Sequence, residues 1–170
     1  LPPLFIFKGA MNGQIAHKFS TYPDQGHSAC QQKAWMDEEA MHTWIYCVLI
    51  LWKNTKAPDV VPILILDAYH VHMMGSIVNR IQSLGIEVHH IPGGCTWLCQ
   101  PVDVGINQPI KKEMTEQWEK WMFDGGGIVV GVAKEPTRKL VAEWIIGTYR
   151  NISVKTGKNT WKQTGYKWFN

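Results

Sequence analysis

The chain has 170 residues, of which 45% are apolar and 18% charged, a balance typical of a globular domain and not of a disordered protein. Its longest apolar runs, 45–52 and 62–66, are far shorter than the ~18 residues that a membrane-spanning helix needs, so we expect no membrane partner. Lys and Arg number 17 against 14 Asp and Glu, a surplus too small to indicate nucleic-acid binding by itself.

The charge is unevenly distributed along the chain. Residues 1–133 hold 9 of the 17 basic and 12 of the 14 acidic side chains, so the remaining segment, 134–170, is strongly basic and could bind phosphate. The 4 cysteines, with no signal peptide, favour a reducing, intracellular compartment over a disulfide scaffold. Because the chain starts inside a strand-like run without a methionine, we expect it to be a fragment.

The first half of the chain contains one predicted strand and one predicted helix. Residues 3–7 form a short apolar run that ends at Lys8, which predicts a strand, whereas 9–33 show no clear period and stay unassigned. From Asp37 to Trp52 apolar residues recur at helical spacing. Three acidic residues, 37–39, stand at the start of this segment, where the positive end of a helix favours them. This pattern predicts an amphipathic helix over 37–52.

A βαβ unit follows, which predicts the α/β fold class. Residues 63–66 are apolar on both faces, as in a central strand of a parallel sheet, and stop at Asp67. A helical pattern over 74–84 closes at Gly85, and 86–91 form a second strand candidate. A right-handed crossover makes the two strands parallel, with their carboxyl ends at one edge of the sheet.

The last part of the chain is predicted to be helical. One helix runs from about Pro109 to Met122 and ends at the three glycines 125–127, and Thr137 caps another with apolar residues turned inward. We therefore divide the chain into a core, 1–124, a Gly-rich linker, 125–136, and a basic C-terminal helical extension, 137–170.

Two carboxylates are the best chemical candidates. Asp67 follows the buried strand directly, and Asp103 lies in the loop after the next strand, so both are expected at the same sheet edge. Paired carboxylates bind hard cations such as Mg²⁺, which suits phosphodiester chemistry. Each also has a plainer interpretation, because Asp67 could simply start a loop or cap a helix and Asp103 could be a helix N-cap.

The histidines, cysteines and tryptophans are weaker candidates. His70, His72, His89 and His90 with Cys95 and Cys99 raise a zinc interpretation, but the spacing is poor. His72 could orient a carboxylate or phosphate, although a polar first-turn residue is the commoner case. Most of the tryptophans fit a core, and Trp97 in the loop is the exception that could stack on a base. No P-loop, nucleophile elbow or dinucleotide fingerprint occurs.

Four blocks of the sequence resemble the DDE-type endonuclease domain of pogo, Tigger and Fot-like transposases in the mariner superfamily. They are LPPLFIFKG at 1–9, WMD at 35–37 with Trp44, ILILD at 63–67 followed by His72, and TWLCQPVDVGI at 96–106 followed by Lys111. Their order and spacing match over roughly residues 1 to 122. AEWI at 142–145 and TGY at 164–166 look like the same family's C-terminal extension, as weaker motifs.

The resemblance implies a partial ribonuclease-H-like three-layer fold in which three carboxylates hold two Mg²⁺ or Mn²⁺ ions. It makes Asp67 the second and Asp103 the third carboxylate. The resemblance also implies that His72 and Gln100 support these carboxylates. The residues that it implies in contact with DNA are Trp97, Lys111 and Lys112. The first carboxylate and the first two strands would precede this chain, and residues 4–7 would be the third strand. The implied activity of the intact protein is cleavage and joining of DNA in the nucleus, with a homodimer as one arrangement.

Two other interpretations stay open. One is a catalytically inactive transposase-derived protein that binds DNA or another partner. The other is an unrelated phosphohydrolase that uses Asp67, His70 and His72 with zinc or magnesium. For the 170-residue chain by itself we expect poor solubility or self-association, from an unpaired apolar strand edge, and no metal-dependent nuclease activity.

Overall fold

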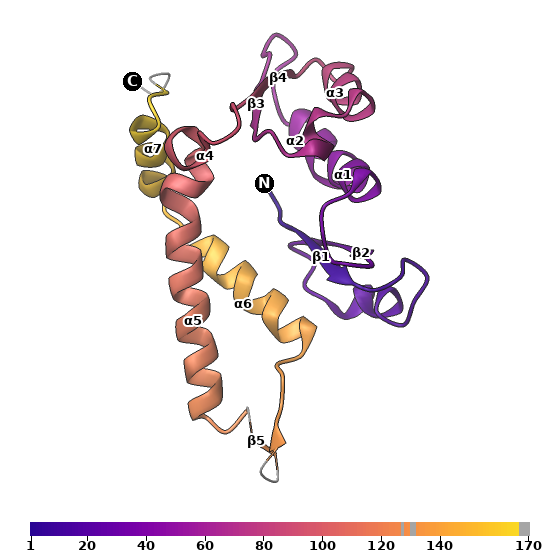
Figure 1. Cartoon of the computed structure of the whole chain (residues 1–170), viewed down its shortest axis with the longest axis vertical. Coiled ribbons are helices and arrows are strands. Elements are labelled where there is room, and N and C mark those ends of the chain that lie inside the picture. Colours follow the sequence, from indigo (N-terminus) through magenta and orange to yellow (C-terminus); the bar gives the residue numbers. More distant parts are fainter. Residues whose placement is uncertain (127, 130–131, 167–170) are drawn as a thin grey trace. The chain divides into compact units, whose positions relative to one another are not determined.

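The computed structural model describes residues 1–126, 128–129 and 132–166. The chain forms two compact units, Leu1–Thr96 and Trp97–Asn170, and each is described by itself (Figure 1). Both helices and strands are present, with parallel pairing in the first unit, which is compatible with the expected α/β class. The ribonuclease-H-like arrangement stays a prediction, as does the division at 124 and 137. None of the described helices is both long and apolar enough to cross a membrane.

The first unit begins with two paired parallel strands. The predicted first strand is confirmed as β1 (Leu4–Lys8), and it pairs with β2 (His27–Gln31), with Leu4 opposite His27. A short 3-10 helix, Ala16–Thr21, lies between them in sequence. The second strand falls within 9–33, which showed no period, because its buried positions are the small Ala29 and Cys30.

The predicted helix over 37–52 is confirmed, with one irregularity. It consists of α1 (Glu38–Trp44), a π-helical turn η2 (Ile45–Leu49) and α2 (Ile50–Lys53). Asp37 is its N-cap, because the carboxylate oxygen Oδ1 accepts a hydrogen bond of 2.9 Å from the backbone N–H of Ala40.

The predicted βαβ unit is confirmed. Strand β3 (Ile63–Leu66) pairs in parallel with β4 (Glu87–His90) across α3 (Gly75–Gln82), after which Gly85 takes a φ of +70° that favours glycine. The expectation that β3 is buried on both faces is wrong for this unit. Leu64 and Leu66 pack against the core, but on the opposite face Ile63 is 40% exposed and Ile65 is only partly buried.

The core of the first unit lies between these helices and one face of the β3–β4 sheet. Its fully buried members come from α1, η2, the 3-10 helix η3 (His70–Met73), α3 and the residue just before β4; they are Met41, Ile45, Leu49, Val71, Ile77, Ile81 and Ile86. This core holds the carboxyl end of β3 in place, and therefore the backbone from which Asp67 projects.

The described part of the second unit is helical apart from one short pair of strands. It contains α4 (Thr96–Cys99), a π-helical turn η4 (Val102–Ile106), α5 (Asn107–Phe123), α6 (Arg138–Asn151) and α7 (Val154–Gln163). Strands β5 (Ile128–Val129) and β6 (Val132–Ala133) pair in an antiparallel hairpin.

The start of the long helix was predicted wrongly. Helical backbone begins at Pro101 and passes through η4 into α5, so Pro109 lies in the third position of α5 and not in the first turn of the helical stretch. Proline inside a helix lacks an N–H and crowds the preceding turn, and a wide π-helical turn directly before it is one way to accommodate the ring. The predicted end is confirmed by Asp124 at the C-cap and a φ of +79° at Gly125, while Gly127 lies outside the described residues.

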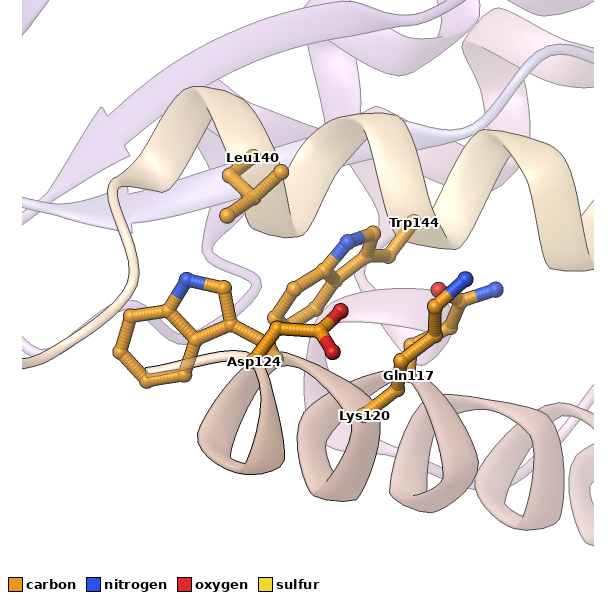
Figure 2. A pocket seen from close by; sticks show the side chains of 6 residues that line it. Gln117, Lys120, Asp124, Leu140 and Trp144 are labelled. Atoms are coloured by element: carbon orange, nitrogen blue, oxygen red, sulfur yellow. The ribbon is translucent and has the colours of Figure 1, made fainter. Parts of the chain in front are cut away.

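Helices α5 and α6 pack through tryptophan rings. Trp121 lies 5.5 Å from Trp118 and 6.3 Å from Trp144 between ring centroids, and Asn151 donates to Glu113 at 2.6 Å. Thr137 caps α6 as predicted. Trp118, expected in a core, is 44% exposed. A shallow pocket of about 160 Å³ lies between the helices, lined by Gln117, Lys120, Trp121, Asp124, Leu140 and Trp144 (Figure 2).

Candidate metal-binding carboxylates

Asp67 is the first residue after β3, and one of its two carboxylate oxygens is tightly held. Oδ1 accepts a hydrogen bond from Nδ1 of His72 at 2.6 Å and another from the backbone N–H of Tyr69 at 3.2 Å. The side chain is 33% exposed. Among the described residues both hydrogen bonds to this carboxylate go to Oδ1, so Oδ2 is the oxygen that can bind a cation.

His72 lies in the 3-10 helix η3 (His70–Met73) and is anchored by its neighbours. A short contact to an ionised carboxylate requires the proton on Nδ1, which fixes the tautomer of a neutral imidazole. The ring of Tyr69 meets His72 edge-on at 5.6 Å between centroids, and the Tyr69 hydroxyl donates to the carbonyl oxygen of Met36 at 3.0 Å. Nε2 of His90 in turn donates to the backbone carbonyl of His72 at 3.0 Å.

These contacts make Asp67 part of an ordered network that links the end of β3 to the end of β4 and the segment before α1. The sequence patterns gave no sign of Tyr69, and they indicated His90 only as a possible zinc ligand. The hydrogen bond from Tyr69 N–H to a carboxylate two residues earlier is a common aspartate turn and could have been expected from the spacing. The contact from His90 depends on the pairing of β3 with β4, which no local signal reveals.

Asp103 lies on η4, in the second unit. Its Oδ1 accepts a hydrogen bond of 2.6 Å from Nδ2 of Asn107, one turn later, and its backbone N–H donates to the carbonyl of Gln100 at 3.1 Å. The side chain is exposed. The alternative interpretation of Asp103 as an N-cap is wrong, because the carboxylate accepts from a side chain inside the helical turn and Pro101 occupies the capping position.

Gln100 carries an unusual feature beside this turn. Its side-chain Oε1 is buried and has no hydrogen-bond partner among the described residues. A buried polar atom without a partner costs about 1–3 kcal/mol, so such atoms usually point to a donor that is supplied from elsewhere.

The residues expected on DNA all lie in the second unit. Trp97, placed by sequence in a loop, is in fact in the short helix α4 and is 73% exposed. Lys111 and Lys112 are exposed on α5, and Lys112 forms an ion pair with Glu116 at 3.8 Å. Their role in DNA binding stays a prediction. That Asp103 lies near Asp67 also stays a prediction, because the two carboxylates belong to different units.

The donor set suits a hard divalent cation better than zinc. In the described part of the chain no three His, Cys, Asp or Glu side chains gather as a complete protein-only metal site would require, so the zinc interpretation gains no support. Carboxylate oxygens with open positions are what Mg²⁺ and Mn²⁺ prefer, since these ions keep waters or phosphate oxygens as their other ligands. Each of the carboxylates Asp67 and Asp103, taken within its own unit, has an oxygen without a hydrogen-bond partner among the described residues and suits this chemistry.

Comparison with known proteins decides the family. Residues 1–161 match the family described as DDE superfamily endonuclease. The chain belongs to this family. It is 27% identical over 157 residues to the human protein "Pogo transposable element with KRAB domain" and 26% identical to its mouse counterpart, which covers 90% of the chain in each case. The human "Pogo transposable element with ZNF domain" is 22% identical over 120 residues, or 71% of the chain.

The match to a DDE superfamily endonuclease confirms the resemblance seen in the sequence. The chain spans 24% of the length of the two KRAB-domain relatives and 8% of the ZNF-domain relative. No solved structure matches the chain. DDE superfamily endonucleases generally use divalent metal ions, in agreement with the carboxylate chemistry described above.

Proposed function

We propose that Asp67 and Asp103 bind the divalent cations of a DNA endonuclease that cleaves and joins phosphodiester bonds. The observation that carries the proposal is the state of Asp67, whose Oδ1 is held by His72 and Tyr69 while Oδ2 has no partner among the described residues. A carboxylate that only caps a loop has no need of a half-buried histidine behind it.

The reaction itself is an in-line displacement at phosphorus. A water molecule or a DNA 3′-hydroxyl forms the new P–O bond and loses a proton, while the bond to the leaving 3′-oxygen breaks. Bound Mg²⁺ or Mn²⁺ ions, when present, neutralise charge on the attacking and leaving oxygens.

In this proposal Asp67 supplies Oδ2 as a ligand and His72 positions it. The Nδ1–H of His72 fixes the plane of the carboxylate and therefore the direction in which the free oxygen points, and carboxylates that bind metals are commonly hydrogen-bonded in this way. His72 therefore acts as a positioning residue. Substitution of His72 should therefore lower the affinity for the metal ion more than it lowers the stability of the fold.

Asp103 supplies the other ligand, and Asn107 positions it from one helical turn away. The amide of Asn107 holds Oδ1, which again leaves the second oxygen toward solvent. Gln100, three residues before Asp103 in the same motif, is assigned a supporting role, and its buried Oε1 has no hydrogen-bond partner among the described residues. That both carboxylates serve one pair of ions rests on the order of the family motifs.

The substrate and location follow from the same proposal. A DDE-type endonuclease acts on DNA, so we place the protein in the nucleus and assign Lys111, Lys112 and Trp97 to DNA contacts. The exposed indole of Trp97 offers a stacking surface, and the exposed lysines offer positive charge to phosphate. A homodimer of the intact protein stays a prediction.

The test is metal-dependent nicking of supercoiled DNA by the 170-residue chain and by longer forms of the protein that contain it. We expect the 170-residue chain to be inactive and a longer form to nick DNA with Mg²⁺ or Mn²⁺. In that form Asp67→Asn and Asp103→Asn should each lower the rate at least about 100-fold, because each removes a charged ligand of the ions.

Two matched substitutions separate this effect from a general loss of charge. Asp59→Asn changes an exposed aspartate in the first unit and Asp124→Asn one in the second, and both should leave nicking unchanged. Nicking that survives Asp67→Asn and Asp103→Asn would overturn the proposal. Longer forms that bind DNA but never nick it would favour the catalytically inactive interpretation instead.

A further inference from the structure

The exposed lysines of α7 form a regular stripe. Lys155, Lys158 and Lys162 are all exposed, at spacings of three and four residues. At about 100° per residue these three side chains lie within an arc of roughly 60° on one face of the helix. The ten residues of α7 include no acidic side chain. The three lysines are called the α7 lysine face below.

The opposite face of α7 is fixed to the turn that carries Asp103. Thr160 is 1% exposed and lies roughly 140–200° around the helix from the lysines. A Cβ at Gly105 would collide with the Thr160 hydroxyl and would lie 3.2 Å from its Cγ2, so glycine is what lets α7 pack this closely on η4. Figure 1 shows α7 beside α4 and the start of α5, within the same unit.

Within the part of the chain that the structure describes, no acidic side chain neutralises the α7 lysine face. Lys112 and Lys139 form ion pairs with glutamates one turn away, but none of the lysines on α7 has an ion pair in the described ranges of the chain. Lys155 also stands in the first turn, where the positive end of the helix disfavours a cation, and its neighbours repel it. The arrangement costs α7 stability unless an anion binds there.

We infer that the α7 lysine face binds the phosphate backbone of duplex DNA, a role that rests on the proposed endonuclease function for its choice of polyanion. Along the helix axis the lysines span about 10 Å at 1.5 Å per residue, a length over which one strand of B-DNA carries about three phosphates at about 3.4 Å of axial rise each. A contact of this kind reads charge and spacing, not sequence.

A membrane surface is the other polyanion that basic helices bind, and the packing of α7 disfavours it. Basic helices that lie on lipid insert an apolar face, but the face of α7 opposite the lysines is occupied by η4. The exposed side chains of α7 are its three lysines, the polar Asn159 and Gln163, and a single apolar residue, Val154, at its first position, which is too little apolar surface to insert into lipid. The partner must therefore be recognised by charge, which phosphodiester DNA satisfies.

The binding test uses the 170-residue chain in EDTA, with fluorescence anisotropy of a labelled duplex of about 20 bp at several salt concentrations. The triple variant Lys155→Gln, Lys158→Gln, Lys162→Gln should bind roughly 10- to 100-fold more weakly near physiological salt. The slope of log K against log salt should become shallower by about 2.7, because each phosphate that a lysine no longer neutralises accounts for about 0.9. Circular dichroism should show an unchanged fold, since all three side chains are exposed.

A matched variant controls for net charge. This control removes three exposed lysines from the first unit through the substitutions Lys8→Gln, Lys18→Gln and Lys33→Gln. Its affinity for the duplex should stay within about twofold of the parent, and its salt slope within about one unit. Equal reductions of affinity in both triple variants would overturn the inference. A second result would also overturn it. In that result the parent chain binds phosphatidylserine vesicles tightly but not the duplex, and the α7 triple variant no longer binds the vesicles.

The inference and the proposed function can fail separately. Because EDTA removes divalent ions, DNA binding by the α7 lysine face is measured without any contribution from Asp67 or Asp103. Asp67→Asn and Asp103→Asn should therefore bind the duplex at least as well as the parent chain, while they abolish nicking in the longer form. Weaker DNA binding in the α7 variant, together with intact nicking in the carboxylate variants, would reject only the endonuclease proposal.

Discussion

The close packing of α7 on η4 predicts that Gly105→Ala destabilises the second unit. An added Cβ would collide with the Thr160 hydroxyl and would lie 3.2 Å from Cγ2 and 3.3 Å from Cβ of Thr160. The threonine cannot easily rotate away, because it is 1% exposed and its hydroxyl donates to the carbonyl of Thr156 at 2.9 Å. Relief requires α7 to move away from η4.

The magnitude follows from two opposing terms. Overpacking by one methyl group in a buried contact lowers the free energy of unfolding by about 1–3 kcal/mol. Replacing glycine by alanine in helical backbone raises it by about 0.5–1 kcal/mol. We therefore expect the free energy of unfolding to fall by about 0.5–2 kcal/mol. For a unit of this size, each kcal/mol corresponds to a drop in Tm of about 4–8 °C.

The assay is thermal and urea unfolding of the 170-residue chain, followed by circular dichroism. Gly147→Ala is the matched control, since a Cβ there meets nothing within 4 Å and the residue lies inside α6. It should stabilise the chain by about 0.5–1 kcal/mol. A Gly105→Ala protein as stable as the Gly147→Ala protein would refute the packing described here.

A double substitution tests the cause. Thr160→Ala removes Oγ1 and Cγ2, the two nearest of the three atoms that the new methyl group meets, so Gly105→Ala combined with Thr160→Ala should be less destabilised than the sum of the two single changes. We expect a coupling energy of at least about 1 kcal/mol, the size typical of residues in direct contact. Additive effects would show that Gly105→Ala acts elsewhere.

Three further predictions concern other parts of the chain. Asp37→Ala should cost about 0.5–2 kcal/mol of unfolding free energy by urea denaturation, because Ala40 N–H loses its cap, whereas Asp37→Asn should cost much less. Ile77→Ala should cost about 2–5 kcal/mol in the same assay, because this core side chain is 0% exposed, and a smaller loss would place it outside a packed core. Burial, and secondarily the Cys99 thiolate, raise the pKa of Tyr166 above 10.0, so ionisation of this phenol opposes folding and stability should fall as pH rises above 10.0. Absorbance titration of Cys99→Ser should show Tyr166 ionising at lower pH than in the parent, and an unchanged titration would contradict this.

The elements with strong periodicity were predictable from the sequence. The 37–52 helix and the β3–α3–β4 unit each carry a long apolar pattern with a cap or a glycine at the end, and both are confirmed. Strand β2 was missed because Ala29 and Cys30 carry too little apolar surface to give a pattern. The start of the long helix was misplaced because Pro109 is typical of a first turn, and a π-helical turn before it has no simple sequence signal.

The candidate site was predictable in its residues but not in its contacts. Asp67 stands out at the end of an apolar strand, and the His72 ring does lie at hydrogen-bonding distance from it. The contribution of His90 depends on strand pairing, and that of Asn107 on continuation of helical backbone through residues 102–106, which the sequence reasoning treated as a loop. The exposure of Ile63 could not be foreseen, because an apolar run does not reveal which of its faces a unit covers.

The most direct test of the proposed metal role is a titration of the ¹⁵N-labelled chain with Mn²⁺, followed by paramagnetic broadening of amide signals. We expect the amides of Ala68 and Tyr69 and those of η4 to broaden first, at the same Mn²⁺ concentrations. Asp67→Asn should remove the broadening beside β3, and His72→Ala should require roughly 10- to 100-fold more Mn²⁺, with His72→Asn intermediate because its amide can still donate to Oδ1. Early broadening at other histidines or carboxylates, or broadening beside β3 that persists in Asp67→Asn, would contradict the claim that this carboxylate binds the ion.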